Sequence, residues 1–206
     1  MKVDPSAISH DAAYFWQIAT IVPRPIAWVS TLNEDGSANL APFSFFMGVG
    51  ADPPMIALSI GTHEREGVEV PKDSWRNIAR TGELVVSLAT EELAAAMNAS
   101  SAEVPYGVDE FGLAGVTKAP SERVAPPRVA ESPVTMECKL ERILELGRGP
   151  SPASLIIAEI LLWHVRDEVV VNGRIDPRLL HTVGRLGGAF YTRTRDLFEM
   201  KRPGRA

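Results

Sequence analysis

Hydrophobic residues in the first third of the chain fall into runs that are typical of β-strands. Two runs cover residues 21–31 and 38–46, and Asn33-Glu34-Asp35-Gly36 between them has the composition of a tight turn. Gly36 can adopt the positive φ that such a turn requires. A third apolar run, 55–60, follows a break at Asp52-Pro53-Pro54. This part of the chain is therefore predicted to form a hairpin and a further strand.

The middle of the chain alternates between helical and extended patterns. Asp73 or Ser74 is expected to cap a short helix, because either side chain can accept hydrogen bonds from the free amides of a first helical turn. Gly82 is a suitable residue just past the end of that helix. The apolar run 84–89 predicts another strand, and the Ala-rich segment 93–100, which follows two glutamates, predicts a second helix.

The last third of the chain is dominated by extended patterns. The Pro-rich interval 119–133 is expected to be a long loop. Two long strand candidates, 134–146 and 154–165, follow it and are separated by a turn rich in Gly and Pro. A shorter candidate, 168–171, ends at Asn172-Gly173, which is a strong hairpin signal.

These elements predict the fold class. Several strands return by turns, and the helices are inserted between them rather than strictly alternating with them, which favours an antiparallel sheet over a doubly wound parallel one. Closing the sheet into a barrel, or pairing two copies of the chain, would protect its edge strands. We therefore predict a mostly β fold with added helices, arranged as a barrel in a single domain over residues 1–206.

Composition and charge narrow the class of protein. The 206 residues carry a net charge of −5 and show no cluster of Lys and Arg, which argues against a nucleic-acid partner. The one cysteine, Cys138, excludes an internal disulfide and any Cys-rich metal site, and the histidines have no metal-like spacing, so no metal is predicted. No signal peptide or membrane span is expected, because the most hydrophobic run, 155–163, is short and contains Glu159. We expect a cytoplasmic protein.

Two polar clusters indicate the chemistry. One lies at the strand ends between Arg24 and Phe46, and the other is Lys72-Asp73-Ser74-Trp75-Arg76-Asn77. A bound phosphate needs several hydrogen-bond donors and a cation, and a planar ring needs peptide groups along its edge and apolar surface against its faces. Together the clusters predict a pocket for a phosphorylated, planar aromatic cofactor.

These residues also identify a family. The chain resembles the flavin reductase-like, FMN-binding split-barrel proteins from about Tyr14 to Tyr191, and the order and spacing of the matching segments are more specific than any one of them. The resemblance implies a Greek-key split barrel that binds FMN, with added helices, and a homodimer whose flavin lies near the subunit interface. The matching segments are Arg24-Pro-Ile-Ala-Trp-Val-Ser-Thr31, Asn39-Leu-Ala-Pro-Phe-Ser-Phe-Phe46, Lys72-Asp-Ser74 with Asn77, and Arg185-Leu-Gly-Gly188 followed by Tyr191.

The resemblance also implies roles for single residues. The expected site has three parts. It has hydroxyl groups near the phosphate or ribityl chain, peptide and side-chain groups along the isoalloxazine ring, and cations at the phosphate. It consists of Ser30, Thr31, Asn39, Leu40, Ala41, Pro42, Ser44, Phe45, Lys72, Ser74, Asn77 and Arg185.

Each of these residues has a simpler interpretation when taken alone. Ser30 and Thr31 can merely end a strand, Lys72 can be a solvated surface lysine, and Asn39 can be a turn residue. Alternation would place Phe43 and Phe45 on one face of the strand and Phe46 on the other. Trp28, Trp75 and the histidines are not included in the expected site, although His181 precedes the Arg185 motif and is a weaker candidate.

The function expected from the resemblance is that of an FMN-binding oxidoreductase, most simply an NAD(P)H:flavin reductase. Hydride transfer between stacked rings needs little side-chain proton chemistry, so no catalytic residue is named. NADH or NADPH would share the open face of the flavin, under the segment 101–112. The reduced flavin would pass electrons to free flavin, a monooxygenase or another redox partner.

Two other functions are compatible with the same residues. The first is an FMN-binding electron-transfer protein that has no NAD(P)H activity of its own and is reduced by a partner. The second is a split-barrel protein that has lost flavin and binds another ligand, which the presence of Ser30, Asn39, Ser44 and Lys72 disfavours. The sequence does not distinguish NADH from NADPH, since no dinucleotide fingerprint is present.

Overall fold

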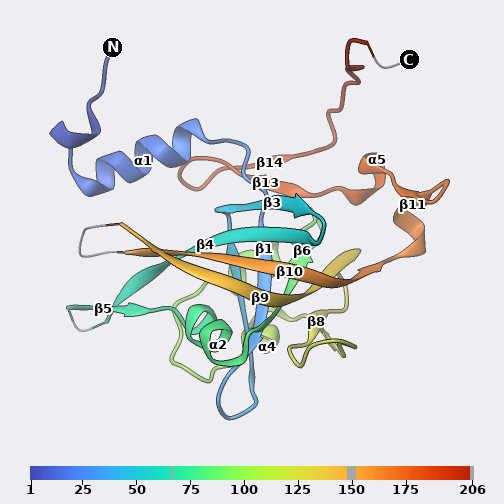
Figure 1. Ribbon diagram of the computed structural model, residues 1–206, viewed down its shortest axis with the longest axis horizontal. Helices are drawn as coiled ribbons and strands as arrows, with labels where there is room; N and C mark the ends of the chain where they lie inside the picture. Colours follow the sequence, from blue (N-terminus) through green and yellow to red (C-terminus); the bar gives the residue numbers. More distant parts are fainter. Residues whose placement is uncertain (66, 148–151, 205–206) are drawn as a thin grey trace.

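The computed structural model describes residues 1–65, 67–147 and 152–204 of the chain. Its main feature is an antiparallel sheet, which has eight strands within those residues. The strands are β1 (Ala27–Leu32), β2 (Ala38–Phe43), β3 (Phe46–Ala51), β4 (Pro54–Arg65), β5 (Val68–Pro71), β6 (Glu83–Leu88), β9 (Val134–Leu146) and β10 (Ala153–Val165). They lie in the order β2-β1-β6-β9-β10-β4-β3, with β5 paired to β4 (Figure 1).

The sheet closes because its two outermost strands belong to one stretch of chain. β2 ends at Phe43 and β3 begins at Phe46, so only Ser44 and Phe45 separate the two edges. The carbonyl of Phe45 accepts a hydrogen bond from Ser59 N of β4 at 2.8 Å. This short link bends the sheet round on itself and leaves the barrel split between β2 and β3. The predicted split-barrel fold, mostly β with added helices, is confirmed.

Smaller elements surround the barrel. The described helices are α1 (His10–Thr20), α2 (Asp73–Thr81), α3 (Ala94–Ala99), α4 (Glu110–Ala114) and α5 (Pro177–Leu180), with 3-10 turns η1 (Pro5–Ala7) and η2 (Asp167–Val169). Three short antiparallel pairs join β7 (Lys118–Ala119) to β8 (Arg128–Val129), β11 (Val170–Val171) to β12 (Arg174–Ile175), and β13 (Val183–Arg185) to β14 (Tyr191–Arg193). Figure 1 shows α1 beside β13 and β14 on one side of the barrel, and α2 and α4 on the other. No helix in the described ranges is long and apolar enough to cross a membrane.

Alternation along the strands produces two hydrophobic cores. On β1, Ala27 and Val29 join the core inside the barrel, whereas Trp28 faces a second core formed with α3 and α4. Trp28 is fully buried and its indole N–H donates to Ser100 Oγ at 2.8 Å. Cys138 lies in the first core, where burial raises the pKa of its thiol to about 12, so it is an inert core residue.

Most of the predicted strands and helices are present. The turn at Asn33–Gly36 joins β1 to β2, with Gly36 at φ 82°, and Gly82 ends α2 at φ 70°. The strands expected at 134–146 and 154–165 are β9 and β10, and Asn172-Gly173 forms the β11–β12 hairpin. The turn expected between β9 and β10 falls largely on residues 148–151, outside the described residues.

Several boundaries differ from the prediction. The strand expected over 38–46 breaks at Ser44 and Phe45, and because of this break Phe43 and Phe46 both pack in the first core instead of on opposite faces. The helix predicted to be capped by Asp73 or Ser74 instead has Lys72 at its N-cap position, since the Ser74 hydroxyl is used elsewhere.

The N-terminal part of the chain also departs from the prediction. The first strand starts at Ala27 rather than at residue 21. Helix α1 was not predicted, because it is mostly exposed and has only one buried residue, Ile18, to mark a hydrophobic face.

A buried carboxylate anchors the long loop 119–133 to the barrel. Glu137 of β9 is fully buried and accepts hydrogen bonds from the backbone amides of Glu122, Arg123 and Val124 and from His164 Nε2, the last at 2.5 Å. Burial alone would raise the pKa of Glu137, but these amides and the His164 ring outweigh it and hold the pKa below its ordinary value.

Glu137→Gln is expected to lower the free energy of unfolding at pH 7 by about 2 kcal/mol, because a neutral amide loses charge-assisted bonds and cannot satisfy all the donors. A carboxyl whose pKa is depressed by folding stabilises the protein above its unfolded pKa of about 4.3, and this contribution is lost as pH falls through the folded pKa. The difference between wild type and variant should therefore shrink below about pH 4. Urea unfolding across this range measures it, with the exposed Glu141→Gln on the same strand as control. A loss that does not depend on pH would contradict the assignment.

Candidate functional site

A buried network of amides and hydroxyls joins β1, β2 and α2. Thr31 and Asn39 are paired across the hairpin, and Thr31 Oγ1 accepts from Asn39 Nδ2 at 3.1 Å and from Asn77 Nδ2 at 3.0 Å. Asn39 Nδ2 also donates to Ser74 Oγ at 2.9 Å, and Asn77 Nδ2 donates to Asn33 Oδ1 at 2.7 Å. The network fixes the first turns of α2 against the β1–β2 hairpin.

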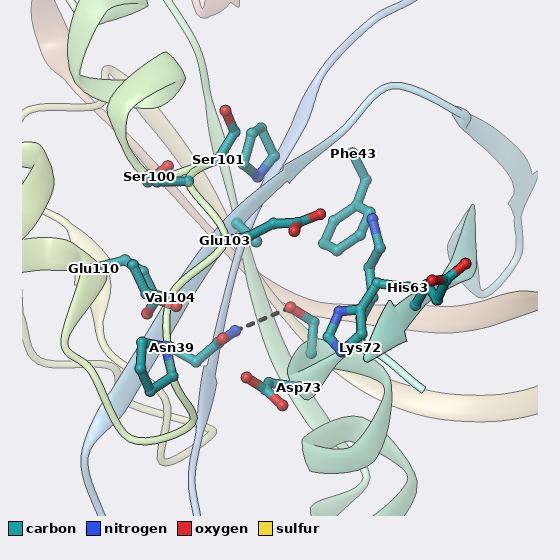
Figure 2. Close-up of a pocket in the computed structure, with 16 residues that line it drawn as sticks. Asn39, Phe43, His63, Lys72, Asp73, Ser100, Ser101, Glu103, Val104 and Glu110 are labelled. Atoms are coloured by element: carbon teal, nitrogen blue, oxygen red, sulfur yellow. Dashed lines mark hydrogen bonds between the residues drawn. The ribbon is translucent and has the colours of Figure 1, made fainter. Parts of the chain in front are cut away.

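A cavity of about 500 Å³ opens beside this network. Asn39 lies at its floor in the view of Figure 2 and donates a hydrogen bond to Ser74, which also lines the cavity. Lys72, the residue that precedes α2, lines it as well. Figure 2 shows Phe43, His63 and Lys72 on one side of the cavity and Ser100, Ser101 and Glu103 on another. The remaining lining residues are Ala41, Pro42, Glu64, Asp73, Ala102, Val104, Pro105 and Glu110.

Charges of both signs face this cavity. The ammonium group of Lys72 lies 6.0 Å from the centre of the Phe43 ring, and among the described residues it has no carboxylate within 4 Å. His63 Nε2 is buried and has no hydrogen-bond partner in the described part of the chain. Burial raises the pKa of Glu110, whose Oε2 accepts from Leu40 N at 3.1 Å. Burial therefore disfavours the charged form of Glu110 relative to that of a solvent-exposed glutamate.

A second, smaller cavity of about 220 Å³ adjoins the first, and Pro42 and Ser101 line both. Its charged residues are Arg24 and Arg185. Ser44 also lines it, together with Tyr14, Ile18, Ile26, Met97 and Tyr191. The segment from Asn39 to Ser44 therefore runs from the floor of one cavity to the wall of the next.

Comparison with protein families agrees with this geometry. The family model described as the flavin reductase like domain matches residues 19–187. This range includes β2 and Lys72 beside the larger cavity, and Arg24 and Arg185 beside the smaller one. The chain belongs to the flavin reductase-like family. An uncharacterized protein of Halalkalibacterium halodurans is 38% identical to this flavin reductase-like chain over 205 residues, covering 98% of the chain and 97% of the relative.

Two solved structures are similar over nearly their whole length. Nitrilotriacetate monooxygenase component B from Bacillus cereus is 33% identical with a TM-score of 0.90, covering 97% of the flavin reductase-like chain and 98% of that protein. The 2-nitrobenzoate 2-nitroreductase of Pseudomonas fluorescens is 29% identical with a TM-score of 0.88, covering 99% and 97% respectively.

The residues expected at the site fall into three groups in this flavin reductase-like fold. Asn39, Ala41, Pro42, Lys72 and Ser74 line the larger cavity. Pro42, Ser44 and Arg185 line the smaller one, so Arg185 is not beside Lys72 in a single cation cluster. The others line neither cavity: Ser30, Thr31, Leu40, Phe45 and Asn77.

The residues of the third group make contacts away from the two cavity linings. Ser30 donates to the carbonyl of Pro127, Leu40 packs in the second core, and Phe45 lies under the guanidinium of Arg24 at 5.8 Å. Thr31 and Asn77 hold the buried network. His181 does not line either cavity and lies 3.8 Å from Glu92.

Other residues that line the cavities are not in the expected site. His63 is not in the expected site, because the histidines have no metal-like spacing and the strand is expected to end at residue 60. In the structure β4 continues to Arg65 and carries His63 into the cavity. Glu110 begins the short helix α4, and Asp109, whose side chain accepts from Phe111 N, was an available capping signal for it. Arg24 stands in a segment that matches the family but is given no role by it, and Glu103 has no local signal. The contacts of Arg24 with Leu186 and the Arg185 strand depend on residues distant in the sequence.

Proposed function

We propose that this chain is an FMN-dependent oxidoreductase that takes hydride from NAD(P)H, as an NAD(P)H:flavin reductase does. The observation that carries the proposal is the meeting of Lys72, Ser74 and Asn39 in one cavity alongside β2, in a chain of the flavin reductase-like family. These three groups supply the cation, the hydroxyl and the amide that a nucleotide phosphate requires.

The phosphate end of FMN fits the larger cavity. Lys72 offers an ammonium group that has no carboxylate partner among the described residues, and it stands at the N-cap of α2. The free amides of the first helical turn and the positive end of the helix dipole lie at the same place. The unpartnered His63 Nε2 adds a buried polar atom that a ligand can satisfy.

The ring of FMN fits along β2. The outer edge of this strand is not paired in the main sheet, and Leu40 N points outward to Glu110. Pro42 has no N–H, which suits an edge strand, and with Ala41 it gives a small apolar wall. At about 3.3 Å per residue, the strand from Asn39 to Phe43 extends roughly 13 Å from the phosphate groups towards the second cavity.

Bound FMN would supply the redox chemistry, accepting hydride from the nicotinamide and passing electrons onward. The protein's residues hold and orient the reactants. Lys72 and Ser74 fix the phosphate, and Ala41 and Pro42 support the ring. Residues 101–105 form the opposite wall, and Tyr106 ties this segment to the hairpin by accepting a hydrogen bond from Glu34 N at 2.9 Å. We propose that the nicotinamide enters under this segment.

Purified protein is expected to bind FMN and to bleach its absorbance near-stoichiometrically when NADH or NADPH is added without oxygen. Mixing the FMN-loaded protein with each nucleotide in turn measures both the activity and the preference between them. Binding of FMN without bleaching by either nucleotide would contradict the reductase and favour the alternative, an electron-transfer protein reduced by a partner. Absence of FMN binding by folded protein would overturn both functions.

The acceptor of the electrons is proposed by similarity. The structure that is 33% identical is named as a component of a monooxygenase, and the one that is 29% identical is named as a nitroreductase. We propose that reduced flavin made by this chain serves a partner monooxygenase or a small acceptor. Following NADH oxidation with free flavin and with a nitroaromatic acid as acceptors distinguishes these outcomes.

We also propose that the chain is a homodimer. Large apolar side chains are exposed on α1 and β3: Phe15 is 58% exposed, Trp16 45%, Met47 54% and Val49 46%. These elements lie on the same side of the barrel (Figure 1). Exposed apolar surface of this kind is typical of protein–protein contacts. Sedimentation equilibrium tests the association, and a monomer at micromolar concentration would contradict it.

A further inference from the structure

The smaller cavity holds two positive charges that the proposed FMN site does not use. Arg24 and Arg185 both line it, none of its lining residues is acidic, and neither arginine has a carboxylate within 4 Å in the described ranges. Arginine stays protonated in proteins, so both groups carry their charge. Two like charges at one small cavity are unfavourable unless an anion compensates them.

Arg24 is held rigidly at the inner wall. It is only 4% exposed, and its Nη1 donates to the carbonyls of Ile18 at 2.6 Å and Ile21 at 2.9 Å while Nη2 donates to Leu186 O at 3.0 Å. These contacts use three of its five N–H groups, and the contact from Nε to Ser44 Oγ is long at 3.4 Å. Burial, and to a smaller degree the nearby charge of Arg185, lowers the pKa of Arg24. One N–H group of Nη2 therefore has no acceptor among these contacts, and the guanidinium keeps its charge.

Arg185 forms the outer side of the same cavity. Its guanidinium stacks on the ring of Tyr191 at 4.6 Å, and it donates to the Tyr191 hydroxyl and to Gly188 O. Both acceptors are neutral, so the charge of Arg185 is positioned but not neutralised. The planar guanidinium is suited to binding a carboxylate through two parallel hydrogen bonds.

The rest of the cavity is apolar and aromatic. Ile18, Ile26 and Met97 line it together with the rings of Tyr14 and Tyr191. Its volume of about 220 Å³ is below the range of about 300–1,000 Å³ that drug-sized ligands occupy. A dinucleotide would exceed it, whereas a small planar ring with one anionic group matches both its size and its lining.

We propose that this cavity is a binding site for small aromatic carboxylates, in which Arg24 and Arg185 hold the carboxylate and the tyrosines and aliphatic residues contact the ring. The site stands on its own geometry and does not require bound flavin. Because Pro42 and Ser101 also line the larger cavity, a ligand here lies next to the proposed flavin. Its role as a reactant of that flavin rests on the proposed function.

Benzoate is the probe for this site. Calorimetric titration of the intact protein, with and without FMN, is expected to show binding of benzoate and at least tenfold weaker binding of the neutral isostere benzamide. Arg185→Gln is expected to weaken benzoate binding at least tenfold, because it removes one of the two charges. Arg193→Gln is the matched control, since Arg193 is on the same hairpin but pairs with Glu91 at 3.3 Å, and it should leave benzoate binding unchanged.

The outcomes separate this proposal from the proposed function. Equal affinities for benzoate and benzamide, or no benzoate binding by folded wild type, would overturn the carboxylate site, and this comparison needs no variant. If inorganic pyrophosphate competed with NADH or NADPH for the protein and benzoate did not, the arginines would be assigned to the phosphates of a dinucleotide. That result would also overturn the carboxylate site. Benzoate binding without FMN binding would leave the site intact and remove only the flavin function.

Discussion

Lys72→Met is expected to weaken FMN binding by about 30- to 100-fold while leaving riboflavin binding within about twofold of wild type. The ammonium group of Lys72 has no carboxylate partner among the described residues, so its loss removes attraction for a phosphate without releasing an internal ion pair. A charge-assisted hydrogen bond contributes about 1.5–3 kcal/mol, and each 1.4 kcal/mol is about a tenfold change in affinity. Riboflavin has no phosphate, which makes the comparison specific.

Fluorescence quenching of each flavin by wild type and variant measures this difference. Lys139→Met is the matched control, because Lys139 is an exposed lysine on β9 that lines neither cavity. An equal loss for FMN and riboflavin would show that Lys72 shapes the ring site instead, and an unchanged affinity for FMN would place the phosphate elsewhere.

Asn77→Leu is expected to lower the free energy of unfolding by about 3 kcal/mol, which corresponds to a fall in Tm of roughly 6–12 °C for a chain of this size. Asn77 is fully buried, and its amide group donates to both Thr31 Oγ1 and Asn33 Oδ1. Leucine has a similar volume but no donor, so two buried oxygens would lose a partner. FMN affinity should fall as well, because the same network orients Asn39 and Ser74.

Thermal and urea unfolding measure the change in stability. Asn77→Asp keeps the shape of the side chain but removes both donors, so it should destabilise the protein at least as much as leucine does. Arg76→Leu, at an exposed neighbouring position of the same helix, controls for a change in helix propensity. A free energy of unfolding for Asn77→Leu within about 0.5 kcal/mol of wild type would contradict the role of the network.

The fold could be predicted where the sequence carries a local signal. The long apolar runs of β9 and β10, the turn at Asn33–Gly36 and the Gly82 helix end each follow from residues adjacent in the chain. The break at Ser44 and Phe45 could not be predicted this way, because the apolar pattern continues through Phe46. The bend exists because the two sheet edges must meet, which is a property of the whole barrel.

In the candidate site, too, some residues have a local signal in the sequence and others depend on the whole fold. Lys72 and Ser74 are neighbours in sequence and face one cavity, as their pattern indicated. Arg24 and Arg185 are distant in sequence and meet only because residues 24 and 185 form an isolated antiparallel bridge. The sequence could therefore suggest a phosphate-binding cluster, but not that Arg185 would belong to a separate cavity with Arg24.

The wall that Pro42 and Ser101 share between the two cavities has a thermodynamic consequence. The ring of proline fixes its φ, so Pro42 has little freedom to adjust. A ligand in one cavity that contacts Pro42 therefore contacts backbone that also lines the other cavity. We expect occupancy of the two cavities to be linked through this shared backbone. If one ligand changes the dissociation constant of the other by some factor, the second ligand changes that of the first by the same factor. This short stretch of β2 is where we expect such cooperativity to arise.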